Sequence, residues 1–405
     1  MATSRIPRWA LLILSGVGLL VVAIPGLWVY MSATAKKLHL NPATISSVTK
    51  SQPPVKWGKA TADARNLART SLAERNLPGL SVAVAIDGDI VWAEGFGFAN
   101  VEDSAPVTPE DRFRIGTASE VLMSAAIGVL LQEGRLKLDD EIQTYVPEFP
   151  PKQWPVTIRQ VMGHIGGLRG EDTDNGVLTS SHCERALDAV KLFAKDPLTQ
   201  PGTQFQYSTF GWVLLSAVIE AAAERPITAF LDDKVLGPLG MHDTVRESET
   251  GPVPEATSYL TRFAANPIYG FRPLPKFDYS CYAGSSGYLS TPSDLVRFGS
   301  AINAGKLLRR DTVQILQTSQ RTASGKETGY GLGWDVKTIT MAGQQLSAVG
   351  NTGEFWNGEV ASLLTIPQRG MAVAVTSNIT HAETSGLVER IAQAFAAQEA
   401  GRAQQ

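Results

Sequence analysis

The stretch Arg114-Ile115-Gly116-Thr117-Ala118-Ser119-Glu120-Val121-Leu122 decides the fold of this chain, because it opens a helix that the apolar spacing predicts to be amphipathic. Within it, Thr117-x-x-Glu120 has the spacing of a capping box. In that motif the threonine hydroxyl accepts from the third helical amide, while the glutamate reaches back to the N–H of the cap. Such a cap stabilises a helix by about 0.5–2 kcal/mol. Our first interpretation of this pair is therefore structural.

Composition excludes several classes of protein. The chain has 405 residues, 43% of them hydrophobic and 19% charged, which is typical of a globular protein with a real core. Its net charge of -3 provides no basic surplus for nucleic acid. Cys183 and Cys281 neither build a disulfide framework nor supply a metal site, and whether they pair stays open. We expect no metal, no cofactor and no nucleic-acid partner.

The N-terminus predicts a membrane anchor. After a short stub at 1–8, no charged residue occurs from Trp9 to Ala35, and residues 9–31 are long enough to span a bilayer, which takes about 20 residues. A cleaved signal peptide is the alternative, because Ala33-Thr34-Ala35 has the form of a cleavage site. We favour the uncleaved anchor, since the run is longer than a usual signal-peptide core. Residues 32–60, rich in proline and serine, are predicted to be a linker.

Strand patterns lie at both ends of the remaining chain, 61–400. Asp87-Gly88 separates two apolar runs and predicts a hairpin with a type I′ turn. Residues 359–366 and 370–377 predict a second strand pair, and residues 383–398 a terminal helix. The middle of the chain reads as helical. We therefore predict an α+β fold, with one antiparallel sheet built from both chain ends, flanking helices and a large inserted helical lobe.

Several motifs resemble the serine β-lactamase and penicillin-binding-protein family, in particular its class C and esterase-like branch. They include the opening stretch and Glu133-Gly134-Arg135-Leu136, Gly287-Tyr288-Leu289-Ser290 and Tyr330-Gly331-Leu332-Gly333-Trp334. Residues 205–215 are most similar to mitochondrial serine β-lactamase-like proteins, which have filament-forming relatives. The resemblance implies a β-lactamase/transpeptidase-like fold and, for the anchored chain, a location outside the cytosol or in the periplasm.

The family's first catalytic motif, S-x-x-K, corresponds to Thr117 and Glu120. The resemblance implies that a serine would attack a carbonyl and that a lysine would help to remove its proton. Here the nucleophile is a secondary alcohol, and a carboxylate replaces the ammonium group. Two other interpretations stay open: Glu120 deprotonates Thr117 with Tyr207 shuttling the proton, or Ser119 is the nucleophile in a shifted register.

The second and third motifs are kept in part. Y-x-N corresponds to Tyr207-Ser208-Thr209, which retains the phenol, and K/H-T-G corresponds to Asn351-Thr352-Gly353. The resemblance assigns Tyr207 and Asn351 to catalysis, and Thr209, Thr352 and Gly353 to substrate binding. The cationic or titratable residue at the head of the third motif is lost.

These substitutions predict a membrane-anchored, degenerate serine hydrolase that acts as a binding or assembly module. The alternative is an active acyl hydrolase, of the esterase, peptidase or β-lactamase type, with Thr117 as its nucleophile. The expected partners are a peptide, cell-wall or ester-like ligand in the cleft, the membrane, and further copies of the chain in a homo-oligomer.

Overall fold

The computed structural model describes residues 24–170, 176–247, 254–282, 284–356 and 358–403. These residues form an eight-stranded sheet in the order β1-β3-β2-β13-β12-β11-β10, with β4 paired to β3. Its strands are β1 (Ser47–Thr49), β2 (Gly79–Ile86), β3 (Asp89–Asn100), β4 (Ala105–Pro106), β10 (Asp335–Met341), β11 (Gln344–Phe355), β12 (Gly358–Ile366) and β13 (Met371–Ser377). Three further short strands, β5 (Phe113–Arg114), β9 (Tyr288–Ser290) and β6 (Val245–Arg246), form a second sheet, and β7 (Tyr259–Thr261) pairs with β8 (Phe271–Pro273).

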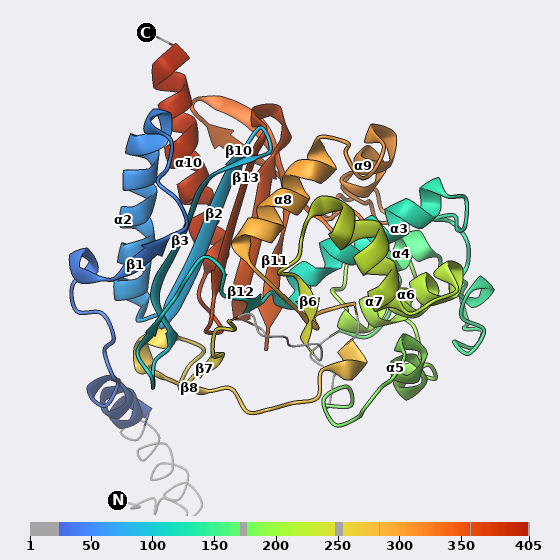
Figure 1. The fold of residues 1–405 in the computed structure, drawn as a ribbon. Coiled ribbons are helices and arrows are strands. Elements are labelled where there is room, and N and C mark those ends of the chain that lie inside the picture. Colours follow the sequence, from blue (N-terminus) through green and yellow to red (C-terminus); the bar gives the residue numbers. More distant parts are fainter. Residues whose placement is uncertain (1–23, 171–175, 248–253, 283, 357, 404–405) are drawn as a thin grey trace, which may run out of the picture.

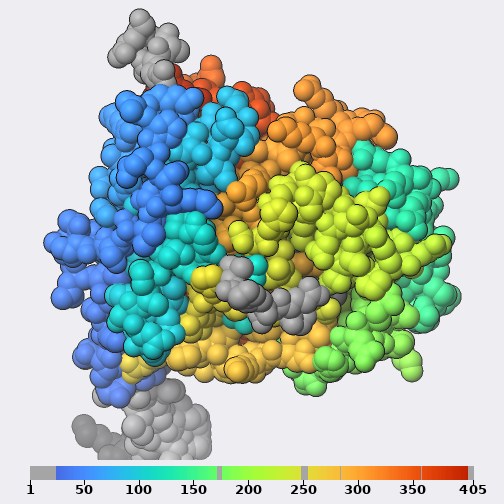
Figure 2. All heavy atoms as spheres, in the orientation of Figure 1, coloured from blue at the N-terminus to red at the C-terminus, as the bar shows by residue number. Residues whose placement is uncertain are grey.

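Helices cover both faces of the large sheet (Figure 1). The α-helices are α2 (Gly58–Arg75), α3 (Glu120–Gln132), α4 (Ile158–Met162), α5 (Ala186–Phe193), α6 (Thr209–Ala223), α7 (Ile227–Leu231), α8 (Pro292–Asn303), α9 (Arg310–Leu316) and α10 (Thr384–Ala403). Helices α2 and α10 pack together on one face, whereas α8 packs on the other and leads to the helical lobe. Figure 2 shows the sheet-bearing half, in blue, packed against that lobe, in green and yellow-green.

The two faces of the sheet carry different side chains. Strand β2 is buried along its whole length, and its alternating residues divide between two cores. Ala83 and Ala85 point into the core that continues into the helical lobe, whereas Val82 and Val84 point into the core under α2 and α10. Because successive strand residues face opposite sides, one apolar strand serves both cores.

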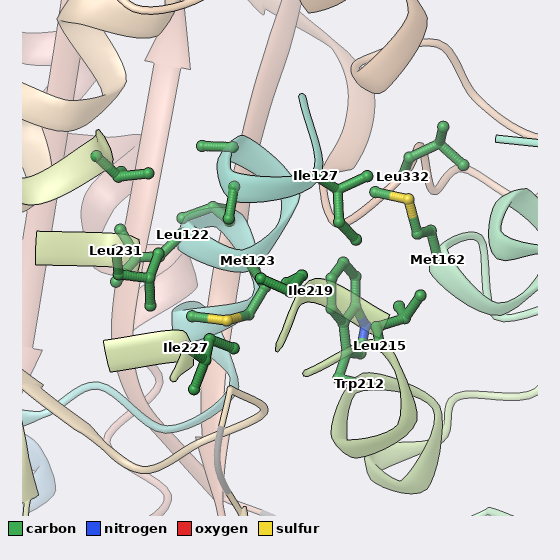
Figure 3. Packing of buried hydrophobic residues seen from close by; sticks show 14 of the residues in the cluster. Leu122, Met123, Ile127, Met162, Trp212, Leu215, Ile219, Ile227, Leu231 and Leu332 are labelled. Carbon is green, nitrogen blue, oxygen red and sulfur yellow. The ribbon is translucent and has the colours of Figure 1, made fainter. Parts of the chain in front are cut away.

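Helix α3 lies at the centre of the helical lobe and is more buried than predicted. Its residues from Glu120 to Leu130 are all buried, so the predicted amphipathic helix has no solvated face over this length. Figure 3 shows Leu122, Met123 and Ile127 of this helix packed among side chains of neighbouring helices, including Trp212. A helix that is apolar on every side belongs in a core.

The predicted plan of the sheet is confirmed. The turn between β2 and β3 has positive φ at both Asp87 (54°) and Gly88 (91°), as a type I′ turn requires. Strand β13, from the C-terminal part, pairs with β2 in an antiparallel register that places Val373 opposite Val84. The sheet is therefore assembled from both ends of the chain, and the domain has the α+β architecture expected.

The predicted linker at 32–60 is in part a component of the folded domain. Strand β1 pairs with β3, with Val48 opposite Gly95, and the short helices η1 (Pro42–Thr44) and η2 (Val55–Trp57) flank it. Trp57 is buried beside Phe395 of α10. The prediction was wrong for this segment because three residues are enough to add a strand to a sheet edge, and so short a strand has little periodicity.

Most of the predicted anchor lies outside the described residues, which begin at residue 24. Residues 24–33 are helical, and Trp28 packs edge-on against Phe263 and Tyr269. In the part of the chain that the structure describes, no helix is both long enough and apolar enough to cross a bilayer. The anchor stays a prediction.

The two cysteines form a disulfide. Cys183 and Cys281, 98 residues apart in the sequence, are bonded, which joins the segment before α5 to the short helix η10 (Ser280–Tyr282). The sequence left this pairing open because two cysteines alone carry no spacing signal.

Candidate functional site

The sequence-predicted residues meet at a cleft with two cavities that share Thr117 and Glu354. One cavity, of about 690 Å³, is called the acidic lobe; it is lined by Thr117, Gly170, Phe205, Gln206, Tyr207, Tyr330, Asp335, Asn351, Thr352 and Glu354. The other, of about 230 Å³, is called the aromatic lobe; it is lined by Thr117, Gly176, Thr179, Thr209, Tyr279, Tyr282, Ser286, Glu354, Phe355 and Trp356. Thr117, Thr209, Tyr207, Asn351 and Thr352 therefore all contribute to one cleft.

Thr117 lies in the short helix η3 (Gly116–Ser119), and its hydroxyl contacts strand β11. The hydroxyl accepts a hydrogen bond from the backbone N–H of Glu354 at 2.8 Å. This contact requires close approach of the two backbones, because a Cβ at Gly353 would lie 1.9 Å from the carbonyl oxygen of Ile115. The strand-edge amide after the third motif is thus directed at the position of the family's nucleophile, as an oxyanion-stabilising donor would be.

The capping-box interpretation of Thr117 and Glu120 is wrong. Helix α3 begins at Glu120 itself, with Ser119 at its N-cap and no side-chain cap hydrogen bond. Ser119 is fully buried, and its hydroxyl donates to the carbonyl of Gly116 at 2.8 Å, so it does not open into the cleft. A turn of 3-10 helix separates Thr117 from the α-helix and shifts the motif out of capping register.

Glu120 is fully buried and accepts hydrogen bonds from two tyrosines. Tyr207, just before α6, donates to one carboxylate oxygen at 2.5 Å, and Tyr330 donates to the other at 2.7 Å. Burial, followed by the nearby Glu120 carboxylate, raises the pKa of Tyr330 well above its usual value, so this phenol keeps its proton. The side chain that replaces the family's lysine therefore lies at the centre of a buried hydrogen-bonded network.

His164 also contacts the buried Glu120 carboxylate. Its ring is buried, and Nε2 lies 3.7 Å from a carboxylate oxygen of Glu120. The amide of Ser208 approaches Nδ1 at 3.1 Å, and the indole N–H of Trp212 approaches Nε2 at 3.2 Å. An imidazole accepts at one nitrogen when neutral and at neither when protonated, so at most one of these two contacts is a hydrogen bond.

Asp335, the first residue of β10, brings a second carboxylate into the acidic lobe. It accepts a hydrogen bond from the amide of Thr352 at 3.2 Å. Burial raises its pKa to about 6, and the neighbouring Glu120 carboxylate acts in the same direction. The residue is therefore half-protonated near pH 6, in contrast to an ordinary surface aspartate.

The third motif presents its backbone to the cleft. The side-chain amide of Asn351 donates to the carbonyl of Gly333 at 3.3 Å, which holds this residue against the loop before β10. The carbonyl of Thr352 lies 3.4 Å from the Thr117 hydroxyl. Asn351 thus occupies the position of the family's cationic residue without supplying a charge.

Two rings of the aromatic lobe contact the guanidinium of Arg114, whose charge is paired with Glu247. The guanidinium of Arg114 lies 5.3 Å from the ring centroid of Tyr279 and 5.9 Å from that of Phe355, while it forms an ion pair with Glu247. Burial raises the pKa of Tyr279 to about 12. This lobe offers ring faces, and Glu354 is the charged side chain among its described lining residues.

Sequence reasoning assigned no role to several residues of the acidic lobe and its base, among them Tyr330, Asp335, His164 and Phe205. Tyr330 stands in the Tyr330–Trp334 segment that carried part of the resemblance, so a signal existed but no role was attached to it. His164 follows the end of α4 and also contacts the Glu120 network.

Comparisons with known proteins give a consistent result. The family model described as Beta-lactamase matches residues 64–398. The serine beta-lactamase-like protein LACTB, mitochondrial, of Bos taurus is 25% identical, in an alignment that covers 84% of this chain and 80% of that protein. The alignments with its human and mouse counterparts cover 57% and 63% of those proteins.

Solved structures show the same fold. The octameric penicillin-binding protein homologue from Pyrococcus abyssi has a TM-score of 0.69 and 25% identity, covering 82% of this chain and 76% of that one. The D-amino acid amidase from Ochrobactrum anthropi SV3 also has a TM-score of 0.69, with 22% identity over 85% of this chain and 99% of that one. Because the family model spans most of the chain and the cleft lies at the family's motifs, the chain belongs to the β-lactamase family.

Proposed function

We propose that this protein is a ligand-binding module of the β-lactamase family with little or no acyl-transfer activity. The observation that carries the proposal is the hydrogen bonding at Thr117 and Glu120. The Thr117 hydroxyl bonds to the backbone of β11, and both oxygens of Glu120 accept from Tyr207 and Tyr330. A nucleophilic alcohol needs a base within hydrogen-bond reach. The hydrogen bonds of the Thr117 hydroxyl are with the backbone of β11, and none is with Glu120, Tyr207 or Tyr330.

The chemistry of the substituted residues supports the same conclusion. A secondary alcohol attacks more slowly than a primary one because its methyl group crowds the approach. An ammonium at position 120 would stabilise a developing alkoxide, whereas the carboxylate of Glu120 opposes it. Among the described residues that line the acidic lobe, Asn351 included, none is a lysine or arginine.

The competing candidate is an active acyl hydrolase, and one observation favours it. The 2.5 Å bond between Tyr207 and Glu120 connects a phenol that lines the cleft to a buried carboxylate. If a substrate drew the Thr117 hydroxyl toward Tyr207, the proton could pass through the phenol to Glu120. Esters, peptides or β-lactams would then be the substrates.

Activity-based labelling separates the two candidates. We expect no stoichiometric labelling of the full chain by a fluorescent penicillin or a fluorophosphonate. Labelling that disappears in Thr117→Ala would overturn the binding-module proposal and establish the hydrolase. Loss in Ser119→Ala, with Thr117→Ala still labelled, would instead identify Ser119, and thermal unfolding of each variant checks that it is folded.

We also propose that the protein is a single-pass membrane protein with this domain outside the cytosol. The apolar run at 9–31 supports the anchor, and the Cys183–Cys281 disulfide supports an oxidising compartment. The chain should stay in the membrane fraction after carbonate washing, at full-length mass. A soluble mature form that begins at Lys36 would show that the run is a cleaved signal peptide.

Self-association is the last part of the proposal. Its support is that the Pyrococcus abyssi homologue is octameric. Light scattering of the purified full chain in detergent tests it, and a monomeric mass across the accessible concentration range would contradict it.

A further inference from the structure

We propose that the acidic lobe binds an organic cation, specifically an ammonium group on a small molecule that also carries an apolar substituent. This inference rests on the proposed function, because it names the ligand class of the same cleft. In the family, the cationic residue of the third motif would attract a carboxylate. Asn351 replaces that residue here, and the ligand that we propose carries the opposite charge.

The charges around the lobe carry the first part of the argument. Among the described residues that line it, Asp335 and Glu354 are acidic and none is lysine or arginine. Glu120 lies directly behind the Tyr207 and Tyr330 side chains that form part of the wall. The charged groups among the described lining residues are therefore acidic, and low-dielectric walls strengthen the field of such groups.

The ring geometry carries the second part independently. Phe205, Tyr207 and Tyr330 line the lobe and surround His164, with ring centroids 5.7, 4.3 and 4.8 Å from the imidazole. Phe205 and Tyr330 lie 5.8 Å apart. Ring faces within about 6 Å of a cation attract it through their quadrupole, and groups of aromatic side chains are a recurrent way to bind ammonium ions.

The Glu120 hydrogen bonds link these two observations. A phenol that donates to a carboxylate gains electron density on its oxygen and ring, because hydrogen bonds in a chain polarise one another. Both tyrosines of the lobe donate to this one carboxylate. The buried charge of Glu120 therefore makes the two rings better partners for a cation, even though Glu120 itself is shielded from the cavity.

Three of the other buried carboxylates have a cation, whereas buried Asp111 is hydrogen-bonded to the Thr108 amide. Glu94 pairs with Arg65, Glu220 with Arg185, and Asp294 with Arg297. For Glu120, no lysine or arginine of the described residues lies within ion-pair distance, and Nε2 of His164 lies 3.7 Å from its carboxylate. Because buried charges are normally compensated, a bound ammonium would add a positive charge beside this carboxylate.

The dimensions define the ligand further. A cavity of about 690 Å³ falls within the range of small-molecule sites. It adjoins the aromatic lobe at Thr117 and Glu354, and Tyr282, Phe355 and Trp356 line that side. An ammonium held by Asp335 and the rings would place an aromatic or apolar substituent toward the second lobe.

Calorimetric titration of the full chain tests the proposal with two matched probes, phenethylammonium and phenylacetate at pH 7.5. We expect phenethylammonium to bind one site saturably and phenylacetate to bind at least about tenfold more weakly. Asp335→Asn should weaken phenethylammonium binding about fivefold or more through the lost charge. Phe205→Leu, at a side chain that is 40% exposed and so dispensable for folding, should weaken it about threefold.

Asp63→Asn is the matched control, since Asp63 forms an exposed ion pair with Lys59 outside the cleft, and it should leave binding unchanged. Equal or tighter binding of phenylacetate, no binding of phenethylammonium, or unchanged binding in both cleft variants would overturn the inference. Covalent labelling by the penicillin probe tests the proposed function separately. A labelled protein that still prefers phenethylammonium keeps this inference, and an unlabelled protein that prefers phenylacetate loses it.

Discussion

Two buried glutamates of this chain have opposite surroundings. Glu94 of β3 receives hydrogen bonds from the guanidinium of Arg65, at 2.7–3.0 Å, and from the indole of Trp92 at 2.8 Å. Glu120 of α3 receives its hydrogen bonds from two phenols. A carboxylate that is fully paired within the fold is a structural element, whereas one that lacks a cation next to a cleft indicates a binding site.

The pKa shifts near the two glutamates have opposite signs. Burial alone would raise the pKa of Glu94, but hydrogen bonds from Arg65, Trp92 and Ser47 outweigh it and lower the pKa. Beside Glu120, burial raises the pKa of Asp335 to about 6. Glu94 therefore contributes stability that is present above its unfolded pKa of about 4.3 and lost as the pH falls. Ionisation of Asp335 reduces stability as the pH rises toward 6.

The largest expected effect comes from breaking the paired site. Arg65→Met leaves the Glu94 carboxylate buried without its cation and should lower the free energy of unfolding by about 3 kcal/mol at pH 7. Urea unfolding measures it. The control Lys59→Met removes an exposed ion pair with Asp63 and should change stability by less than about 0.5 kcal/mol. Equal effects of the two variants would remove the distinction between paired and unpaired glutamates.

A substitution in the cleft is expected to raise the free energy of unfolding rather than lower it. Asp335→Asn removes a charge that is costly above pH 6, so the variant should be more stable than the parent by about 2 kcal/mol at pH 8. At pH 4 the aspartate is protonated in the folded protein, and the two proteins should be nearly equal. Unfolding at both pH values checks this. A variant that is destabilised at pH 8 would mean that Asp335 stabilises the fold through the Thr352 amide rather than serving the site.

A smaller effect is expected in the pH dependence of ligand binding. The groups that face Asp335 are Glu120, His164, Tyr330 and Lys337, and its own carboxylate titrates near pH 6. Affinity for phenethylammonium should fall about threefold from pH 7 to pH 5 as Asp335 takes up a proton, because the neutral side chain is expected to bind about as weakly as the asparagine of the variant. Asp335→Asn should flatten this profile. A profile that keeps its slope in the variant would assign the titration to another of these groups.

The parts of the fold that depend on neighbouring residues were predictable from the sequence. The contacts of the site, which join residues far apart in the sequence, were not. Asp87-Gly88 determines its own turn, and the alternation in β2 determines its two faces, so the sheet followed from short patterns. The capping box failed because the partner of Thr117 is the amide of Glu354, 237 residues away. Glu120 likewise meets Tyr330 across 210 residues. A local sequence pattern does not show such long-range hydrogen bonds, so it could not reveal that they replace a helix cap worth about 1 kcal/mol.

The smallest effect, and the most informative about the history of the cleft, is expected from restoring the family's chemical groups. The variant Thr117→Ser with Glu120→Lys and Asn351→His returns a primary hydroxyl beside the Glu354 amide and an ammonium beside Tyr207. We expect slow but detectable acyl-enzyme formation with a penicillin or an activated ester, measured by intact-protein mass, and none in the parent or in Thr117→Ser alone. The reversed charge at position 120 should also shift the probe preference from phenethylammonium toward phenylacetate. A folded triple variant that stays inert but has changed its probe preference would mean that the electrostatics of the lobe depend on Glu120, while the geometry for acyl transfer has been lost elsewhere in the cleft.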